Sequence, residues 1–535
     1  MSTDVHVNEQ LNQMLKRARR NTLGDLLART KERDPEKFAI AYKGVRLNYG
    51  ELDDVVNQTA HAFLNNGMKK GDMITVMSKN SLDFVIANFA LARIGAVMIP
   101  INYMLTVEDV QYILQHAGVS GFIAEKEYAS VLDESVGELD IKHRYLMDVS
   151  ATERITEDLS EWTPLSVARH GQSTEFVEAA LEDDDLAHVL YTSGTESRPK
   201  GVMLSHKSIV SEYVSCVVNG DMSEHDVCIH ALPLYHSAQL HCFLGPSIYL
   251  GSSGIILDAA KPDIVLETIE KEGATQLFCP PTVWIALLRH PDFDKRDLST
   301  LEKCYYGAAI MPREILKELS ERLPNARFWN FYGQTEVAPL ATALQPEDQL
   351  RKLGSAGKPS LNMQTKIVDD NDQEVPRGEV GEIVHRTPHA MKGYLHDPDK
   401  TAEAFRNGWF HSGDLAIMDE EGYITIVDRK KDMIKTGGVN VSSREVEEAI
   451  YQMDGVSEVA VISIPDPYWI EAVTAIIVPK EGANFTKEDV IEFCKDHLSK
   501  FKIPKHVEIT NELPKNPSGK VLKRTLRDEY ESLAK

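Results

Sequence analysis

The chain has no closely spaced pair of cysteines. Its six cysteines, at positions 216, 228, 242, 279, 304 and 494, are scattered through apolar stretches, and none forms a C-x-x-C pair. This spacing fits neither a disulfide framework nor a zinc site. We expect buried, reduced thiols, which are typical of proteins in a reducing compartment, and we therefore predict a cytoplasmic protein.

The sequence also lacks an apolar run long enough to span a membrane and an apolar signal-peptide core at its start. It is short of positive charge, with 58 Lys and Arg against 82 Asp and Glu and a net charge of -24. Such a balance disfavours binding to nucleic acid or anionic lipid. We predict no integral membrane segment, no nucleic-acid partner and small molecules as partners. The basic cluster at 16–20 is interpreted as a solvated helix face, with a membrane or targeting element as the alternative.

The 535 residues, 42% of them hydrophobic, predict several domains with large cores. Along the first 400 residues the apolar spacing alternates between helix-like and strand-like periods, which indicates α/β structure. Helices are expected at 52–63, 82–94, 208–218 and 262–270, and strands at 73–77, 96–100, 254–257 and 276–279. The predicted fold class is α/β, with a large N-terminal domain of largely parallel, helix-covered sheets.

The sequence pattern changes at about residue 365. Short strands separated by Asp, Gly and Pro turns, at 364–368 and 381–385, predict a β-rich subdomain. A strand at 423–427 precedes the charged segment 428–432, and a helix–strand–strand–helix pattern follows over 446–498. We place a boundary in the charged segment, which divides the chain into a domain 1–430 and a small α+β domain 431–535.

Residues 191–201 combine hydroxyl side chains, Gly194 and Lys200 between two strand-like segments, 187–191 and 201–205. Flexible backbone, hydroxyls and one cation are groups that bind a polyphosphate. A Walker P-loop needs Gly directly before the Lys, Ser or Thr directly after it and a helix beyond, and the sequence fails on all three counts. The alternative is a polar hairpin loop with a solvated lysine.

Four further segments carry chemically active side chains in a fixed order. They are 330–336, which ends in Glu336, 409–414, which ends in Asp414, the pair Asp428 and Arg429 after a strand, and the rigid loop 514–520, which ends in Lys520. Each has an ordinary structural explanation, such as a turn-forming aspartate or an exposed lysine. Their joint occurrence in this order favours one common site.

In this order the segments resemble the core motifs of the adenylate-forming superfamily, which includes acyl-CoA synthetases, nonribosomal-peptide adenylation domains and beetle luciferases. The resemblance extends from about residue 47 to residue 527, and segments 47–52, 95–100 and 232–236 match lesser motifs. One departure lies in the phosphate loop, where the family usually has Thr-Gly and this chain has Glu196 and Ser197. Because an extra acid repels a triphosphate, we expect Glu196 to face solvent or to help hold a metal.

The resemblance implies an enzyme that uses ATP, Mg²⁺ and coenzyme A. A carboxylate attacks the α-phosphate to give an acyl-adenylate and pyrophosphate, and the thiol of coenzyme A then displaces AMP. The resemblance makes Lys520 the main catalytic residue and Glu336 and Thr192 the metal ligands. The residues implied for ATP and AMP binding are Thr192, Ser193, Gly194, Thr195, Lys200, Gly307, Ala308, Ala309, Asn330, Tyr332, Gly333, Thr335, Asp414 and Arg429.

The family pattern also implies individual roles. Asp414 is expected to accept hydrogen bonds from the ribose hydroxyls, with Arg429 assisting at ribose or phosphate. The segment 307–309 and Tyr332 are expected to enclose the adenine, because small residues let a ring approach the backbone.

The family's small domain rotates between the two chemical steps, and by position the hinge is Lys431. This implies a mobile C-terminal domain. Gly437 and Gly438 match the loop that lines the tunnel for coenzyme A, with an ordinary glycine turn as the alternative.

The acyl pocket implied by the resemblance includes His236, Leu240 and Tyr306, and its other walls, such as 337–339, are mostly apolar. No Asp is evident to bind an α-amino group, which disfavours an amino-acid substrate. His236 is expected to contact the carboxylate or act as a gate, and the alternative is a packed core histidine. The preferred substrate is a medium- or long-chain fatty acid, with a coumarate-like aryl acid as the alternative.

Two other classes remain open. One is an adenylation enzyme that loads its acid onto a separate carrier protein. The other is a non-enzymatic relative that binds nucleotide, against which Glu336 and Lys520 argue. The sequence does not specify the oligomeric state, for which a homodimer is one option.

Overall fold

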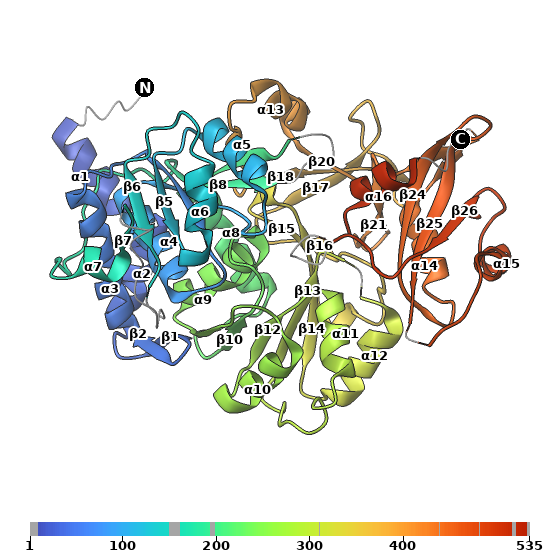
Figure 1. Cartoon of the computed structure of the whole chain (residues 1–535), viewed down its shortest axis with the longest axis horizontal. Helices are drawn as coiled ribbons and strands as arrows, with labels where there is room; N and C mark the ends of the chain where they lie inside the picture. The colour runs from blue at the N-terminus through green and yellow to red at the C-terminus, as the bar shows by residue number, and fades with distance from the viewer. Residues whose placement is uncertain are drawn as a thin grey trace, which may run out of the picture. The chain divides into compact units, whose positions relative to one another are not determined.

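The computed structural model describes residues 9–148, 161–192, 198–309, 311–437, 439–480, 482–515 and 521–531. The backbone divides into two compact units, Met1–Gln364 with Arg386–Glu403, and Thr365–His385 with Ala404–Lys535 (Figure 1). This division groups residues 404–430 with the C-terminal segment, whereas the sequence predicts a boundary at 430/431. The domain boundary at 430/431, with Lys431 as hinge, stays a prediction.

The first unit contains an eight-stranded sheet. In spatial order its strands are β19 (Gly393–Tyr394), β9 (Lys200–Ser205), β8 (Leu186–Thr192), β4 (Val97–Pro100), β3 (Met73–Met77), β5 (Gly121–Ala124), β6 (His143–Leu146) and β7 (Thr163–Pro164). The strands from β8 to β7 are parallel, and β9 and β19 are antiparallel additions at one edge.

A nine-stranded sheet completes the β-structure of this unit. Its order is β16 (Lys358–Pro359), β15 (Leu340–Leu344), β14 (Arg327–Gly333), β13 (Lys303–Gly307), β12 (Gln276–Phe278), β10 (Val227–His230), β11 (Ser253–Ile256), β1 (Phe38–Tyr42) and β2 (Val45–Asn48). The six strands from β14 to β1 are parallel, and antiparallel strands flank them on both sides.

Helices connect and cover the strands of the first unit. They are α1 (Glu9–Arg19), α2 (Leu23–Arg33), α3 (Tyr49–Asn65), α4 (Leu82–Ile94), α5 (Val107–Ala117), α6 (Ala129–Glu134), α7 (Leu165–Arg169), α8 (His206–Asn219), α9 (Gly245–Leu250), α10 (Pro262–Glu272), α11 (Pro281–Arg289), α12 (Arg313–Arg322) and α13 (Pro398–Ala404). Shorter helical turns are η1 (Lys126–Tyr128), the π-helical η3 (Ala238–Leu244), η4 (Thr335–Val337) and η5 (Pro346–Asp348).

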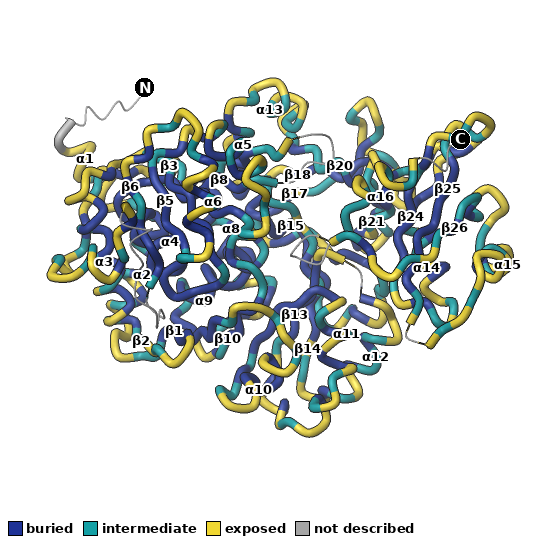
Figure 2. Tube along the Cα trace, in the orientation of Figure 1, coloured by how far each residue is buried: buried dark blue, intermediate teal, exposed yellow. Residues whose placement is uncertain are grey.

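Helix α4 lies between the two sheets. All of its residues are buried, and Figure 2 shows it in the interior of the unit. It shares one core cluster with Ile40 and Ile256 of the nine-stranded sheet and with Ile74 and Met98 of the eight-stranded sheet. Because α4 is buried on every side, its polar residues Asp83, Asn88 and Arg93 included, it joins the two sheets into one core.

The second unit contains two smaller sheets. The first has the order β17 (Gln364–Val368), β18 (Val380–Arg386), β20 (Phe410–Met418) and β21 (Ile424–Arg429), with the turn η6 (Arg406–Gly408) before β20. The second has the order β23 (Val439–Val441), β22 (Ile434–Thr436), β25 (Ile470–Pro479) and β24 (Val456–Asp466), and β26 (His506–Ile509) pairs with β25.

Three helices pack against the second of these sheets, and β24 shows the two-residue alternation that this requires. Val459 and Val461 lie in the cluster with α14 (Ser443–Ile450) and α15 (Lys487–His497). Ala460 and Ile462 lie in the cluster with α16 (Lys523–Tyr530). The sheet is therefore covered by helices on both faces.

The predicted fold class and all helices and strands expected from the sequence are confirmed. The predicted helix 82–94 and strand 73–77 match α4 and β3 residue for residue. The six cysteines are free and buried, as predicted. Among the described residues, no helix combines the length and hydropathy that a membrane span requires.

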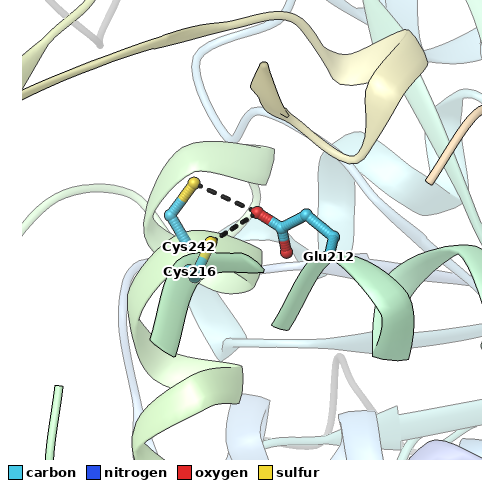
Figure 3. A group of neighbouring side chains, drawn as sticks. All are labelled: Glu212, Cys216 and Cys242. Carbon is cyan, nitrogen blue, oxygen red and sulfur yellow. Dashed lines mark hydrogen bonds between the residues drawn. The ribbon is translucent and has the colours of Figure 1, made fainter. Parts of the chain in front are cut away.

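Two of these cysteines share a hydrogen-bonded group with Glu212 (Figure 3). The Oε1 atom of Glu212 accepts hydrogen bonds from the thiol of Cys216 at 2.8 Å and the thiol of Cys242 at 3.4 Å. It also accepts one from the backbone N–H of Leu340 at 3.4 Å. Burial raises the pKa of Glu212 well above its ordinary value, and burial raises the pKa of both thiols as well. Burial therefore favours the neutral forms of the carboxyl and of both thiols.

Replacing Glu212 by Gln removes the titrating proton and keeps an oxygen that accepts from the thiols. The stability that this acid contributes is fully present below its unfolded pKa near 4.5, and it is lost as the pH rises, because the folded-state pKa is raised. We expect the Tm of Glu212→Gln, relative to wild type, to increase by about 1–2 °C per pH unit as the pH rises above the unfolded pKa of the acid. Calorimetry at several pH values measures this difference, with the exposed Glu134→Gln as control. A difference that does not change with pH would contradict the assignment.

Candidate active site

Several predicted site residues lie at the carboxyl ends of parallel strands in the first unit. Thr192 ends β8, Gly307 ends β13, and Gly333 ends β14. In α/β sheets this edge is the usual ligand-binding edge, because the loops that leave it are free to vary while the strands stay fixed.

The segment predicted to bind polyphosphate lies between two strands, as expected from the sequence, and the structure shows that these strands, β8 and β9, pair antiparallel. Thr192 of β8 is the cross-strand partner of Lys200 of β9, so the hydroxyl and the cation expected to bind phosphate lie opposite each other where the hairpin opens. Ser193, Gly194 and Thr195 lie outside the described residues, as does the departure at positions 196 and 197.

Glu336 lies in the turn η4, directly after β14. Its Oε1 atom accepts a hydrogen bond of 3.0 Å from the hydroxyl of Tyr394, and its backbone carbonyl accepts one of 2.8 Å from the N–H of Met391. The neighbouring Thr335 hydroxyl is 3.0 Å from the hydroxyl of Ser237. The turn is therefore held by a return segment, 391–395, and by Ser237 directly before η3.

The residues expected to enclose adenine follow the ends of β13 and β14. Gly307 pairs with Phe331, and a Cβ atom at Gly307 would lie 2.4 Å from the carbonyl oxygen of Phe331. Close approach of two strands therefore requires this glycine, independently of any ligand. Ala308, at φ 63°, and Ala309 are exposed beyond the strand end.

Asn330 and Tyr332 lie two positions apart in β14, so their side chains point to the same face of the sheet. The amide of Asn330 donates a hydrogen bond of 3.0 Å to the carbonyl of Ser355, so part of its hydrogen-bonding capacity is used within the fold. A Cβ atom at Gly333 would lie 1.8 Å from the carbonyl oxygen of Pro339, so this glycine too is required by the turn.

His236 is exposed, which excludes the packed core histidine that the sequence left open. Its Nδ1 atom accepts a hydrogen bond of 3.2 Å from the backbone N–H of Ala238. An acceptor at Nδ1 places the proton of a neutral imidazole on Nε2. His236 is thus able to donate from Nε2 to a carboxylate.

The other two residues predicted for the acyl pocket are buried in different clusters. Leu240 of η3 packs in the cluster around α4, and Tyr306 of β13 packs in the cluster with α11 and α12. The hydroxyl of Tyr306 donates a hydrogen bond of 2.6 Å to Gln349, and burial raises the pKa of this tyrosine. Tyr306 is therefore fixed by the core, and its pocket role stays a prediction.

In the second unit, Asp414 of β20 and Arg429 of β21 are cross-strand partners. The guanidinium Nε atom of Arg429 is 3.3 Å from the carboxylate of Asp414, which is 5% exposed. The adjacent Asp428 accepts hydrogen bonds from the backbone and hydroxyl of Ser443, at the start of α14. Asp428 therefore has a structural role, while Asp414 and Arg429 form one pair.

The remaining predicted residues concern the C-terminal segment. Gly437 has φ 56°, and its N–H donates a hydrogen bond of 2.7 Å to the carbonyl of Trp469. A Cβ atom there would lie 3.0 Å from the ring of Trp469. Gly438 and Lys520 lie outside the described residues.

Tyr394 and Ser237 contact the predicted site and were missed in the sequence. Tyr394 lies 58 residues beyond Glu336 in a two-residue strand, too short to show a period. Ser237 directly follows His236, which the sequence predicts as a site residue, but the contact of Ser237 with Thr335 is not predicted. The contact of Tyr394 with Glu336 is recognised only from the structure, in which β19 pairs with β9.

Comparison with known proteins gives the relatives of this chain. A family model described as AMP-binding enzyme matches residues 27–395, and one described as AMP-binding enzyme C-terminal domain matches residues 445–520. The chain is 34% identical over 512 residues to a feruloyl-CoA synthase from Amycolatopsis sp, which covers 96% of this chain and 100% of that protein. It is 32% identical over 539 residues to a long-chain-fatty-acid–CoA ligase from Escherichia coli, which covers 96% and 95%.

Among solved structures, ATP-bound MatB from Rhodopseudomonas palustris has a TM-score of 0.87 and 30% sequence identity to this chain. The match covers 96% of this chain and 100% of that one. The similarity therefore includes both units.

Replacing Gly307 by Ala tests whether the fold itself needs this glycine. Because a Cβ atom would lie 2.4 Å from a backbone oxygen of the neighbouring strand, we expect a loss of about 1–3 kcal/mol in the free energy of unfolding. Urea denaturation measures it, and Ala309→Ser at an exposed neighbouring position is the control. Unchanged stability of Gly307→Ala would mean that the strands separate without cost and that the glycine is needed only by a ligand.

Proposed function

We propose, from the premise that this chain belongs to the AMP-binding enzyme family and is an acid–thiol ligase, that it activates a medium- or long-chain fatty acid. The acid would be joined to AMP and then transferred to coenzyme A. Relatives at 34% and 32% identity are named as CoA ligases of an aryl acid and of a fatty acid, respectively. Ligation of a carboxylic acid to coenzyme A is therefore the shared activity, and the acid is the open question.

One observation carries the proposal. Thr192 and Lys200 face each other at the ends of β8 and β9, and Glu336 lies in the turn η4. Strand β19 contacts both places, because it pairs with β9 and its Tyr394 donates a hydrogen bond to Glu336. Transfer of AMP moves negative charge between phosphates, and hydroxyl and ammonium donors stabilise that charge. These groups suit ATP better than they suit a neutral ligand.

The two proposed steps balance in atoms and charge. A carboxylate oxygen of the acid bonds to the α-phosphorus of ATP, the bond to the bridging oxygen breaks, and pyrophosphate leaves. The thiolate sulfur of coenzyme A then bonds to the acyl carbon, and AMP leaves with the carboxyl oxygen. We assign Lys520 to the oxygens of the carboxylate and the α-phosphate in the first step, where a fixed cation offsets developing charge.

The residues also fit a magnesium ion. Mg²⁺ prefers oxygen ligands and is bound in nucleotide sites by one or two protein groups together with phosphates. Glu336 and Thr192 would supply the protein oxygens, and Oε1 of Glu336 is already hydrogen-bonded to Tyr394. When bound, the ion would neutralise charge on the phosphates.

The preference for a fatty acid rests on the apolar walls expected for the acyl pocket. Leu240, Val337 and Ala338 are at most 1% exposed and carry no polar side-chain atom. Each buried CH₂ group of a substrate contributes about 0.8 kcal/mol, so an apolar pocket rewards chain length. His236, with its proton on Nε2, would meet the carboxylate end of the acid.

An aryl acid is the second candidate, favoured by one feature of the core. The ring of Phe243, in η3, stacks with the rings of Phe278 and Phe331, with centroid separations of 4.3 Å and 5.9 Å. Aromatic walls favour a flat, aromatic ligand. The 34% identity to a feruloyl-CoA synthase supports the same alternative.

A panel of acids decides between the candidates. With ATP, Mg²⁺ and coenzyme A, we expect kcat/KM for AMP release with medium- or long-chain fatty acids to exceed that with acetate or coumarate by about 10-fold or more. Lys520→Ala is the control and should lose acid-dependent pyrophosphate exchange while still binding ATP. A preference for coumarate would overturn the fatty-acid assignment. Pyrophosphate exchange without thioester formation on free coenzyme A would favour a carrier protein as acceptor.

The proposed hinge, Lys431, lies between two anchored residues of the second unit. The ammonium of Lys430 is 2.8 Å from Asp370, beside the four-stranded sheet. The carboxylate of Asp432 is 2.5 Å from the guanidinium of Arg527 in α16. Because both neighbours are tied to different elements, rotation about the backbone of Lys431 would move α16 relative to the four-stranded sheet.

Restricting this backbone should separate the two chemical steps. Because Pro fixes φ near -65°, we expect Lys431→Pro to reduce one of the two half-reactions at least about 10-fold more than the other. Pyrophosphate exchange measures the first half-reaction, and thioester formation from preformed acyl-adenylate measures the second. Lys431→Ala, which keeps the backbone free, is the matched control. Equal loss of both half-reactions in Lys431→Pro would count against the hinge.

A further inference from the structure

The segment 391–395 makes contacts with two parts of the candidate site at once. The backbone N–H of Met391 donates a hydrogen bond of 2.8 Å to the carbonyl of Glu336, in the turn η4. The N–H of Leu395 donates one of 2.8 Å to the carbonyl of Gly201, in strand β9 of the hairpin made by β8 and β9, here called the phosphate hairpin after its proposed ligand. The segment therefore ties the carboxylate turn to the hairpin.

Tyr394, in the middle of this segment, repeats the link with its side chain. Its hydroxyl donates to Oε1 of Glu336 at 3.0 Å. Its ring centroid is 4.9 Å from the ammonium nitrogen of Lys200, a distance at which a cation is attracted to an aromatic face. One side chain thus contacts the predicted metal ligand and the predicted phosphate cation.

The backbone of Tyr394 is itself fixed. Its N–H donates a hydrogen bond of 2.9 Å to the hydroxyl oxygen of Thr401, and that hydroxyl donates to the carbonyl of Asp397 at 2.7 Å. In β19, Tyr394 is the cross-strand partner of Val202. The phenol is therefore attached to a rigid turn.

The hydrogen bond between Tyr394 and Glu336 runs from the phenol to the carboxylate, because an ionised carboxylate only accepts hydrogen bonds. A carboxylate that accepts on one oxygen has its orientation fixed and its second oxygen available to a metal.

We propose that Tyr394 is a positioning residue for the metal ligand Glu336: its hydroxyl orients the carboxylate beside the phosphate hairpin and thereby sets the affinity for ATP in the presence of Mg²⁺. This inference rests on the proposed function, which makes Glu336 a metal ligand. Groups that hydrogen-bond to metal ligands fix the ligand geometry, and removing one typically costs 10–100-fold in metal affinity. A role in folding alone would change stability and leave the metal dependence of ATP binding unaltered.

Tyr394→Phe removes the hydroxyl and keeps the ring, the strand and the contact with Lys200. With the full-length protein, isothermal titration calorimetry gives the Kd of ATP in excess Mg²⁺ and in EDTA. We expect Tyr394→Phe to bind ATP about 10-fold more weakly than wild type in Mg²⁺ and equally in EDTA. An unchanged Kd in Mg²⁺, or an equal loss in both conditions, overturns the inference.

Tyr112→Phe is the matched control. The hydroxyl of Tyr112 donates to the carbonyl of Pro199 at 3.3 Å, so this variant also removes a phenol that contacts the hairpin, but one that does not touch Glu336. Its ratio of Kd values in Mg²⁺ and in EDTA should equal that of wild type. A shifted ratio in Tyr112→Phe as well would overturn the inference, because any phenol near the hairpin would then have the same effect.

A double-mutant cycle with Glu336→Gln tests whether the effect passes through the carboxylate. In the Glu336→Gln background, Tyr394→Phe should change the Kd in Mg²⁺ by less than about 2-fold. Independent, multiplicative losses would overturn the inference. If the Kd of wild type and that of Glu336→Gln are both insensitive to Mg²⁺, the metal role of Glu336 in the proposed function fails, and this inference fails with it. If wild type responds to Mg²⁺ and Tyr394→Phe matches it, only this inference fails.

Discussion

Strand β19 pairs antiparallel with β9, and the geometry of the candidate site depends on this short pairing. Gly393 lies opposite Met203 and Tyr394 opposite Val202, which fixes the register of the return segment against the phosphate hairpin. A shift by one residue would turn the phenol of Tyr394 to the other face of the sheet, away from Glu336. Hydrogen bonds therefore join strand β9, the turn η4 and the return segment, although 58 residues separate Tyr394 from Glu336.

The parts of the fold that could be predicted are those with strong local periodicity. The helix α4 is largely apolar and bounded by Ser81 and Gly95, which cap it, so its bounds could be predicted from the sequence. The strands β8 and β9 were predicted because each is an apolar run on one side of a polar loop. The order of motifs indicated the family, since it needs no knowledge of three-dimensional contacts.

The contacts that could not be predicted depend on register between distant segments. Tyr394 lies in a strand of two residues, and nothing in its neighbourhood indicates a partner in η4. For Gly307, the sequence suggested room for adenine, whereas the structure adds a second reason, the carbonyl of Phe331 in the adjacent strand. For His236 the sequence allows either a site residue or a packed core histidine, and its exposure in the structure excludes the second. Glu212 is a similar case, because its position in the sequence gives no sign that the thiol of Cys242, 30 residues away, donates to it.

The central claim is that Glu336 and Thr192 hold the metal that accompanies ATP, with Tyr394 orienting the carboxylate. The most direct test is a crystal structure of the protein with ATP and Mn²⁺, in which anomalous scattering locates the ion. The account predicts one ion about 2.1 Å from a carboxylate oxygen of Glu336, with the other oxygen hydrogen-bonded to Tyr394. An ion bound to the phosphates but distant from Glu336, or a Glu336 carboxylate turned away from Tyr394 in that complex, would contradict it.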